Sequence, residues 1–167
     1  MNSKTSQPDF TRITTFILDV DGVLTDGTLY CFADGEQVRG FNIKDGFAIK
    51  HAISMGYRVA VISGKNEPSV RRRLEALGIR DLFMGSEDKL DHFENYLYNN
   101  SIHPATVAYM GDDMPDLEVL KACGLPCCPA DACDDVLEIC DFISEKEGGK
   151  GAVRDLIETV MKVQDNW

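Results

Sequence analysis

Long apolar runs, a secretory leader and an excess of positive charge are all missing from this 167-residue chain. No stretch approaches 18 consecutive apolar residues, so we expect no membrane span. The first nine residues are polar and lack the apolar core of a signal peptide, which predicts a cytoplasmic protein. With 28 acidic and 17 basic residues the net charge is −11, which excludes a global attraction to nucleic acid or to anionic membrane.

The cysteines lack the spacing of a metal site. Five of the six lie between residues 123 and 140, but no C-x-x-C pair and no nearby histidine accompanies them. A zinc site stays open as an alternative. The favoured interpretation is that they are reduced thiols buried as small apolar side chains.

What the chain does have is an alternation of strand and helix patterns. Its length fits one domain over residues 1–167, with residues 1–10 as a loose N-terminal extension. Expected strands are 14–20, 57–62, 81–84, 106–110, 125–128 and 141–143, and expected helices are 45–55, 68–77, 89–98, 115–122, 131–139 and 152–163. Residues 29–32 and 37–41 flank a turn and predict a β-hairpin. The alternation predicts an α/β fold, a Rossmann-like parallel sheet between two layers of helices.

Two acidic motifs follow expected strands. In the first, Asp19 and Asp21 are two residues apart on extended chain and point the same way, so a cation or a shared proton must separate them. In the second, residues 111–116 (GDDMPD) supply hard oxygen ligands, of which Asp112 is the expected Mg²⁺ ligand. The alternatives are a solvated loop for the first motif and helix capping by Asp113 for the second.

Hydroxyl, glycine and basic residues complete the candidate site. Ser63 and Gly64 end a buried strand and could form a small anion cradle, although Ser-Gly is also ordinary turn chemistry. Lys89 opens a helix, where a cation opposes the helix dipole, which hints at another task. Residues 71–73 are three successive arginines, so at most one faces any single target. The glycine-rich segment 148–154 is either a flexible connector or a mobile flap that binds anions.

Together these motifs resemble those of the haloacid dehalogenase-like phosphotransferases: DVDGVLTD at 19–26, Ser63, Lys89 and GDDMPD at 111–116. The resemblance implies that Asp19 is the nucleophile, forming an aspartyl-phosphate, and that Asp21 is the general acid/base. It also implies that Ser63, Gly64 and Lys89 bind the phosphoryl group. Mg²⁺ would be held by Asp19, Asp112 and the Asp21 backbone carbonyl. Asp113 and Asp116 would contact these ligands rather than the ion itself.

The chain has no room for the cap domain that usually selects the substrate in this superfamily. It is similar to the capless 3-deoxy-D-manno-octulosonate (KDO) 8-phosphate phosphatases in its DGVLTDG extension, in FNIKDG at 41–46 and in GGKGAVR at 148–154. The resemblance implies a protruding hairpin, a homotetramer in which a neighbouring subunit helps to close each site, and a role in lipopolysaccharide precursor synthesis. Lys65, Arg71, Lys150 and Arg154 are the expected contacts to the anionic sugar acid.

Three rival functions fit the sequence less well. A phosphatase for a nine-carbon, sialic-acid-type 9-phosphate is disfavoured because related enzymes of that kind carry Glu where this chain has Lys65. A signalling receiver domain places its paired acids and phosphorylated Asp in a different order. A non-catalytic oligomerising domain would have lost motif residues, and none is lost here.

Overall fold

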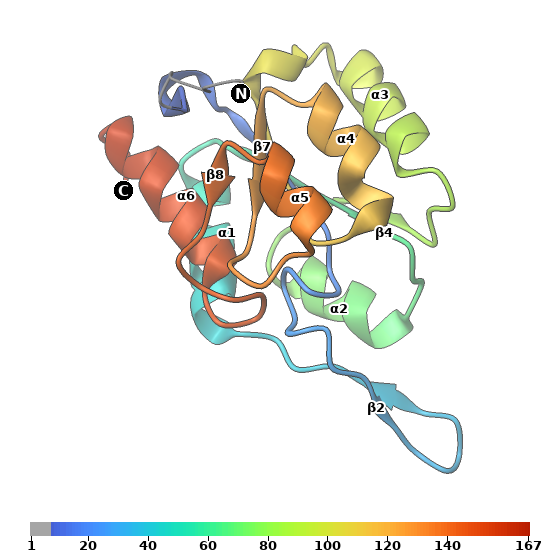
Figure 1. The fold of residues 1–167 in the computed structure, drawn as a ribbon. Helices are drawn as coiled ribbons and strands as arrows, with labels where there is room; N and C mark the ends of the chain where they lie inside the picture. Colours follow the sequence, from blue (N-terminus) through green and yellow to red (C-terminus); the bar gives the residue numbers. More distant parts are fainter. Residues whose placement is uncertain (1–7) are drawn as a thin grey trace.

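Six parallel strands form one sheet in the computed structural model, which describes residues 8–167 (Figure 1). They are β1 (Thr15–Leu18), β4 (Arg58–Ser63), β5 (Asp81–Met84), β6 (Val107–Met110), β7 (Leu125–Cys128) and β8 (Phe142–Ile143). Their order across the sheet is β5–β4–β1–β6–β7–β8. Every residue of β1 is buried, because this central strand has a strand on each side and helices on both faces.

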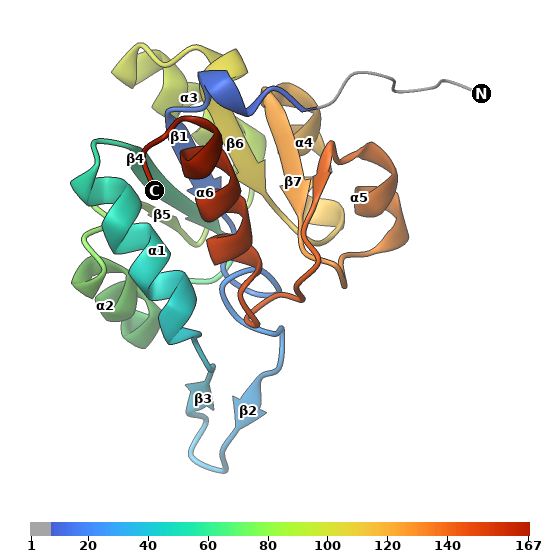
Figure 2. The ribbon, with the colours of Figure 1, turned by 90° about the vertical axis from the view of Figure 1, so that its left-hand side faces the viewer.

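Helices cover the two faces of the sheet (Figures 1 and 2). One apolar core lies under α1 (Ile43–Ser54), α2 (Pro68–Ala76) and α6 (Ala152–Val163), and a second lies under α3 (Lys89–Asn100), α4 (Leu117–Ala122) and α5 (Asp134–Ile139). This is the three-layer Rossmann-like fold that the alternating pattern predicts. None of the helices in residues 8–167 is long and apolar enough to cross a membrane.

The topology determines where a ligand can bind. From β1 the chain moves outward to β4 and β5, then returns across β1 to β6 and continues to β7 and β8. The carboxyl ends of β1, β4 and β6 therefore flank the point where the direction of winding reverses. Ligands of doubly wound sheets bind in the crevice at such a point. The sequence motifs at 19–22, 63–65 and 111–116 all follow these three strands.

A hairpin takes the place of a cap domain. Strands β2 (Tyr30–Cys31) and β3 (Gln37–Val38) pair antiparallel and project from the body of the molecule (Figure 2). They are two residues long each, shorter than the predicted strands, because no further strand pairs with them. Several of the hairpin's apolar side chains are exposed: Leu29, Tyr30, Phe32 and Val38.

Helix starts differ from the predicted ones for local reasons. Helix α1 begins at Ile43 because Asn42 Oδ1 accepts the Lys44 N–H at 2.8 Å and caps the helix. The expected helix at 115–122 divides into a 3₁₀ turn, η3 (Met114–Asp116), and α4. Helix α5 begins at residue 134, because Asp131 lies outside the helix and accepts the Gly148 N–H at 2.9 Å.

Residues 10–13 pack against the body of the molecule and against the end of α6. Residues 1–7 of the expected N-terminal extension lie outside the described residues. Its end is ordered as a 3₁₀ turn, η1 (Phe10–Arg12), and the Phe10 ring meets Phe142 edge-on with centroids 5.9 Å apart. Gln164, just after α6, donates to the Phe10 and Ile13 carbonyls at 2.7 and 2.8 Å. The last helix therefore holds the start of β1 in place.

Candidate active site

Asp19 occupies the carboxyl end of the central strand. Its backbone N–H donates to the Met110 carbonyl at 3.0 Å, and its Oδ1 accepts the Val20 N–H at 2.7 Å. The side chain is buried, and its Oδ2 lies 3.0 Å from the Lys89 ammonium. The carboxylate is thus fixed at both oxygens in the crevice that the topology predicts.

Lys89 owes its position at the start of α3 to these acids. Its Nζ also lies 2.8 Å from Asp116 Oδ1, and the side chain is buried. Burial opposes the charged form, but the carboxylates of Asp19 and Asp116 raise the pKa of Lys89. The unfavourable helix position noted in the sequence is therefore offset by two buried ion pairs.

Asp116 is the hub of the second acidic motif. Besides Lys89, its Oδ1 accepts the buried Tyr109 hydroxyl at 2.6 Å, while its Oδ2 accepts the backbone N–H groups of Asp112 and Asp113 at 3.1 and 3.4 Å. Burial, with the carboxylates of Asp116 and Asp19 beside it, raises the pKa of Tyr109 well above its usual value. These bonds shape the loop that carries Asp112. Asp113 is exposed and caps η3, accepting the Met114 N–H at 2.8 Å.

The two acidic motifs touch at Gly22. This residue has φ of +83°, and a Cβ there would lie 1.9 Å from Asp112 Oδ2. Only glycine allows this turn and this close approach. One oxygen from each of Asp19, Asp112 and Asp116 falls within 4.8 Å of the others, so three carboxylates share one small region.

The crowding of acids has an electrostatic consequence. Burial, followed by the neighbouring Asp116 carboxylate, raises the pKa of Asp19 to about 7. The same two causes, with Asp113, raise the pKa of Asp112 to about 7. Lys89 supplies one positive charge against three acids. The region therefore keeps an excess of negative charge that can bind a hard divalent cation. The oxygen-only donor set fits Mg²⁺ rather than zinc.

Ser63 and its neighbours form the opposite wall. Ser63, at the end of β4, is buried, and its Oγ accepts the Lys65 N–H at 3.3 Å. The next strand braces this turn, because Ser86 N donates to the Ser63 carbonyl at 2.9 Å and Gly85 N to the Lys65 carbonyl at 3.1 Å. Asp19, Asp21, Ser63, Gly64, Lys65, Lys89, Asp112, Asp113 and Asp116 all line one open cleft of about 840 Å³.

Three of the expected substrate contacts lie away from this cleft within the chain. Arg71 pairs with Glu75 on α2, with Nη1 4.0 Å from Oε1, and Lys150 Nζ lies 3.6 Å from Asp26 Oδ2. Arg154 Nε lies 3.0 Å from Glu158 Oε2, and its guanidinium lies over two aromatic rings, Phe47 and Trp167. Of the cations predicted to contact substrate, Lys65 lines the cleft.

Arg73 and the glycine-rich segment 148–154 both pack against other parts of the chain. Arg73 lies against α1, where a Cβ on Gly46 would come within 2.8 Å of its Nη2. Gly148 lies against the first motif, and a Cβ there would lie 1.8 Å from the Gly22 carbonyl oxygen. Gly149 N donates to the Val23 carbonyl at 3.0 Å, and Asn42 Nδ2 donates to the Gly149 carbonyl at 3.3 Å. This segment therefore braces the Asp19–Gly22 loop from outside.

Sequence reasoning missed two groups at this site. The first is Arg39, whose guanidinium contacts the Asp21 carboxylate, with Nε 2.6 Å from Oδ1. A single arginine just after a hairpin strand gives no signal that would have found it. The second is Ser86, which lines the cleft and whose Oγ lies 2.9 Å from His92 Nδ1. His92 Nδ1 also lies 3.0 Å from the Asp88 carbonyl, which only a protonated Nδ1 can satisfy.

Comparisons with known proteins agree with this geometry. The pattern of the haloacid dehalogenase-like hydrolases matches residues 81–157. The 3-deoxy-D-manno-octulosonate 8-phosphate phosphatase of Escherichia coli K12 is 38% identical over 153 residues, covering 92% of this chain and 81% of the relative. A crystal structure of the Yersinia pestis phosphatase of that name matches with a TM-score of 0.92 at 35% identity, covering 94% of this chain and 85% of that one.

A third relative carries ligands. The Moraxella catarrhalis phosphatase, solved in complex with magnesium, phosphate and KDO, matches with a TM-score of 0.91 at 32% identity, over 94% of this chain and 90% of that one. Identity at this level over nearly the whole of both chains, together with the shared fold, establishes kinship. This chain belongs to the haloacid dehalogenase-like hydrolases, and within them to the family of the 3-deoxy-D-manno-octulosonate 8-phosphate phosphatases.

Proposed function

We propose that this protein is a Mg²⁺-dependent phosphatase that hydrolyses KDO 8-phosphate to KDO and inorganic phosphate, in the synthesis of lipopolysaccharide precursors. The observation that carries the proposal is the convergence of Asp19, Lys89 and Ser63 in one cleft of a chain of this family. A non-catalytic role is disfavoured because each motif residue lies at the cleft.

The first step forms an acyl phosphate on Asp19. Its carboxylate oxygen attacks phosphorus while the bond from phosphorus to the sugar oxygen breaks, and Asp21 gives its proton to that leaving oxygen. Lys89 lies 3.0 Å from Asp19 and screens the approach of the carboxylate to the anionic phosphoryl group. Ser63 and the backbone at Gly64 bind the phosphoryl oxygens.

The second step regenerates the enzyme. Water attacks phosphorus, its proton goes to Asp21, and the bond between phosphorus and Asp19 breaks to release inorganic phosphate. Asp19, Asp112 and the Asp21 carbonyl would hold Mg²⁺, which when bound supplies positive charge to the phosphoryl oxygens. Asp116 and Asp113 support the metal site without binding the ion. Asp116 holds the loop that carries Asp112, and Asp113 caps η3.

The hairpin supports an oligomeric form. Its exposed apolar side chains, Leu29, Tyr30, Phe32 and Val38, would stay in water in a single chain, and such patches mark contact surfaces. We propose a homotetramer in which hairpins assemble and a neighbouring subunit helps to close each cleft. Cations that lie outside the cleft in one chain, such as Arg71, Lys150 and Arg154, then become available to a neighbour's substrate.

Replacing the nucleophile tests the chemistry. Asp19→Asn should lower Mg²⁺-dependent release of inorganic phosphate by about 10³-fold or more, because an amide cannot form the acyl phosphate. The measurement is phosphate release from KDO 8-phosphate at saturating Mg²⁺. Asp134→Asn, on the exposed first turn of α5, is the matched control and should keep full activity. Full activity in Asp19→Asn would refute the mechanism.

Metal binding should depend on pH. Mg²⁺ competes with protons for Asp19 and Asp112, and both carboxyls have pKa values of about 7 in the metal-free protein. Below pH 7 both are mostly protonated, so the affinity for Mg²⁺ should fall by about tenfold or more from pH 8 to pH 6. Calorimetric titration in buffers of different ionisation heats measures the affinity and the protons released. An affinity that is constant from pH 6 to pH 8, with no proton release, would contradict the assignment.

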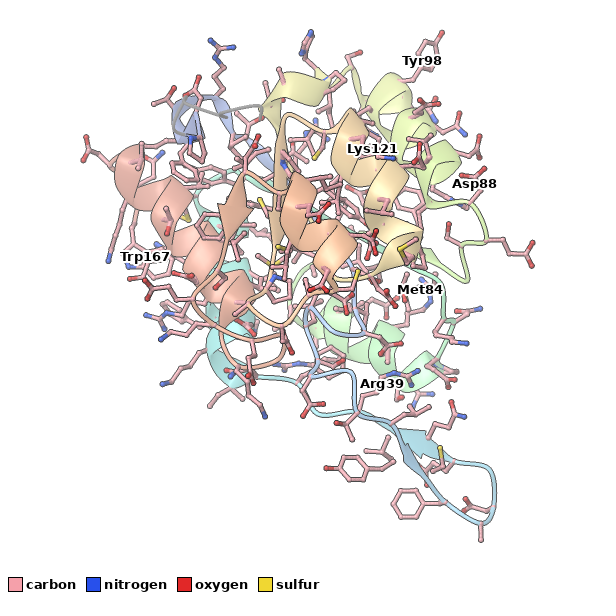
Figure 3. The ribbon with its side chains drawn as sticks, in the orientation of Figure 1. Arg39, Met84, Asp88, Tyr98, Lys121 and Trp167 are labelled. Atoms are coloured by element: carbon pink, nitrogen blue, oxygen red, sulfur yellow. The ribbon has the colours of Figure 1, made fainter. Side chains whose placement is uncertain are left out.

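Assembly is tested on the hairpin. Wild-type protein should elute with the mass of four chains in light-scattering chromatography, and Tyr30→Asp should dissociate it and lower kcat/KM at least about tenfold. The matched control is Tyr98→Asp on α3, which lies at the far end of the molecule from the hairpin (Figure 3). A wild-type monomer with full activity would rule out a shared site.

Substrate choice is tested at Lys65. The wild-type enzyme should have a higher kcat/KM for KDO 8-phosphate than for the nine-carbon sugar acid 9-phosphate. Lys65→Glu should lower the value for KDO 8-phosphate by about tenfold, equivalent to ~1.4 kcal/mol, because it replaces attraction of the sugar carboxylate by repulsion. Lys50→Glu, at an exposed position of α1 that does not line the cleft, is the control. The reverse order of the two substrates in the wild type would favour the nine-carbon alternative.

A further inference from the structure

Arg39 connects the hairpin to the catalytic acid. It follows β3, where the hairpin joins the body of the molecule (Figure 3), and its side chain turns inward to the first acidic motif. Nε lies 2.6 Å from Asp21 Oδ1, and Nη2 lies 3.4 Å from Oδ2. Asp21 and Arg39 are 18 residues apart, so this ion pair ties two separate segments together.

The burial of Arg39 is unusual for a surface hairpin. Its side chain is 4% exposed, whereas that of Asp21 is 38% exposed. Nη1 is also buried, and within residues 8–167 no acceptor reaches it. Removing a guanidinium from water and leaving one donor unpaired both oppose folding, and Asp21 is a half-exposed partner that offsets only part of this. The pair is therefore poorly explained as a device for stability.

The geometry at the carboxylate is asymmetric. Oδ1 receives the short bond from Nε, which fixes its direction. Oδ2 is held weakly, at a distance where a hydrogen bond contributes little. Arg39 thus orients the carboxyl group, and the weakly held Oδ2 is the oxygen better able to exchange a proton with a reacting group in the cleft that Asp21 lines.

We infer that Arg39 is the positioning residue of Asp21: it holds Oδ1 and so aims the weakly held Oδ2 of the general acid/base at the leaving oxygen of the substrate. This inference rests on the proposed function, since it takes Asp21 as the group that protonates the leaving group. Arg39 also makes the hairpin part of the catalytic machinery, because the segment proposed to form the subunit contact carries this guanidinium.

A purely structural role makes a different prediction. If Arg39 only supported the fold, its loss would lower the activity towards every substrate alike. If it positions the acid, the loss depends on the leaving group. The alkoxide of a sugar phosphate needs a proton as it departs, whereas 4-nitrophenolate leaves readily without one. The value of kcat/KM reports this first phosphoryl transfer and excludes later hydrolysis of the aspartyl-phosphate.

The experiment compares two esters in one set of variants. Arg39→Ala should lower kcat/KM for KDO 8-phosphate by about 30-fold or more and that for 4-nitrophenyl phosphate by less than about threefold. Arg39→Lys should recover part of the loss, since lysine offers one charged donor but no fork. The control is Arg12→Ala, which removes an exposed arginine that pairs with Asp9 and should leave both values unchanged. Equal losses on both esters, or no loss, would overturn the inference.

A double-mutant cycle gives an independent readout. Asp21→Asn should show the same dependence on the leaving group, and adding Arg39→Ala to it should cause no further loss, because the residue being positioned is already inactive. Additive losses would contradict the inference. If Asp21→Asn does not fold, the comparison of the two esters in Arg39→Ala still tests whether Arg39 positions Asp21.

Failure of the substrate assignment would look different. Wild-type protein that hydrolyses 4-nitrophenyl phosphate and glycerol 2-phosphate but not KDO 8-phosphate would refute the proposed substrate. Glycerol 2-phosphate, also an alkyl ester, then takes the place of the sugar phosphate in the comparison, and the inference about Arg39 is decided by the same ratio.

Discussion

One buried ammonium group holds this active site together. Lys89 Nζ lies 3.0 Å from Asp19 and 2.8 Å from Asp116, at the carboxyl ends of the two central strands β1 and β6. Without it, three carboxylates would be crowded into a region shielded from water, which is strongly unfavourable. With it, the excess of negative charge falls to an amount that one divalent cation can offset. The loop that carries Asp112 depends on the same cluster, because Asp116 accepts its backbone N–H groups.

The main features of the fold and much of the site could be predicted from the sequence. Apolar strands ending in polar residues locate the edge of the sheet where Asp19, Ser63 and Asp112 meet, because parallel strands bring their carboxyl ends together. The unusual lysine at the start of α3 makes ion pairs outside the helix, with Asp19 and Asp116, while its role in binding phosphate stays a prediction. These signals are local, since each depends on a few neighbouring residues and on the period of the pattern.

What could not be predicted depends on contacts between distant segments. Arg39 meets Asp21 only because the hairpin folds back beside the first motif. Arg154 belongs to a glycine-rich motif that suggested an anion contact, yet in the chain it lies between Phe47 of α1 and the C-terminal Trp167. No periodicity in the sequence reports how α1 and α6 lie against each other. The glycines at 148 and 149 likewise look like a flexible connector until the loop that they brace is seen.

The balance of charge at the cleft supports the proposal that a neighbouring subunit completes the site. Eight acidic side chains and two basic ones, Lys65 and Lys89, line it. A phosphorylated sugar acid brings two anionic groups, and Lys89 is already shared between two carboxylates. Bound Mg²⁺ would offset the charge of the phosphoryl group. Lys65 is then the one cation of the described cleft lining left for the sugar carboxylate. The cations on α2, on α6 and in the segment before α6 lie outside the cleft of their own chain, so a neighbouring subunit is the natural source of the missing positive charge. In the proposed homotetramer the exposed apolar hairpin would bring this neighbour into place, and Arg39 at its base would link the assembly to Asp21.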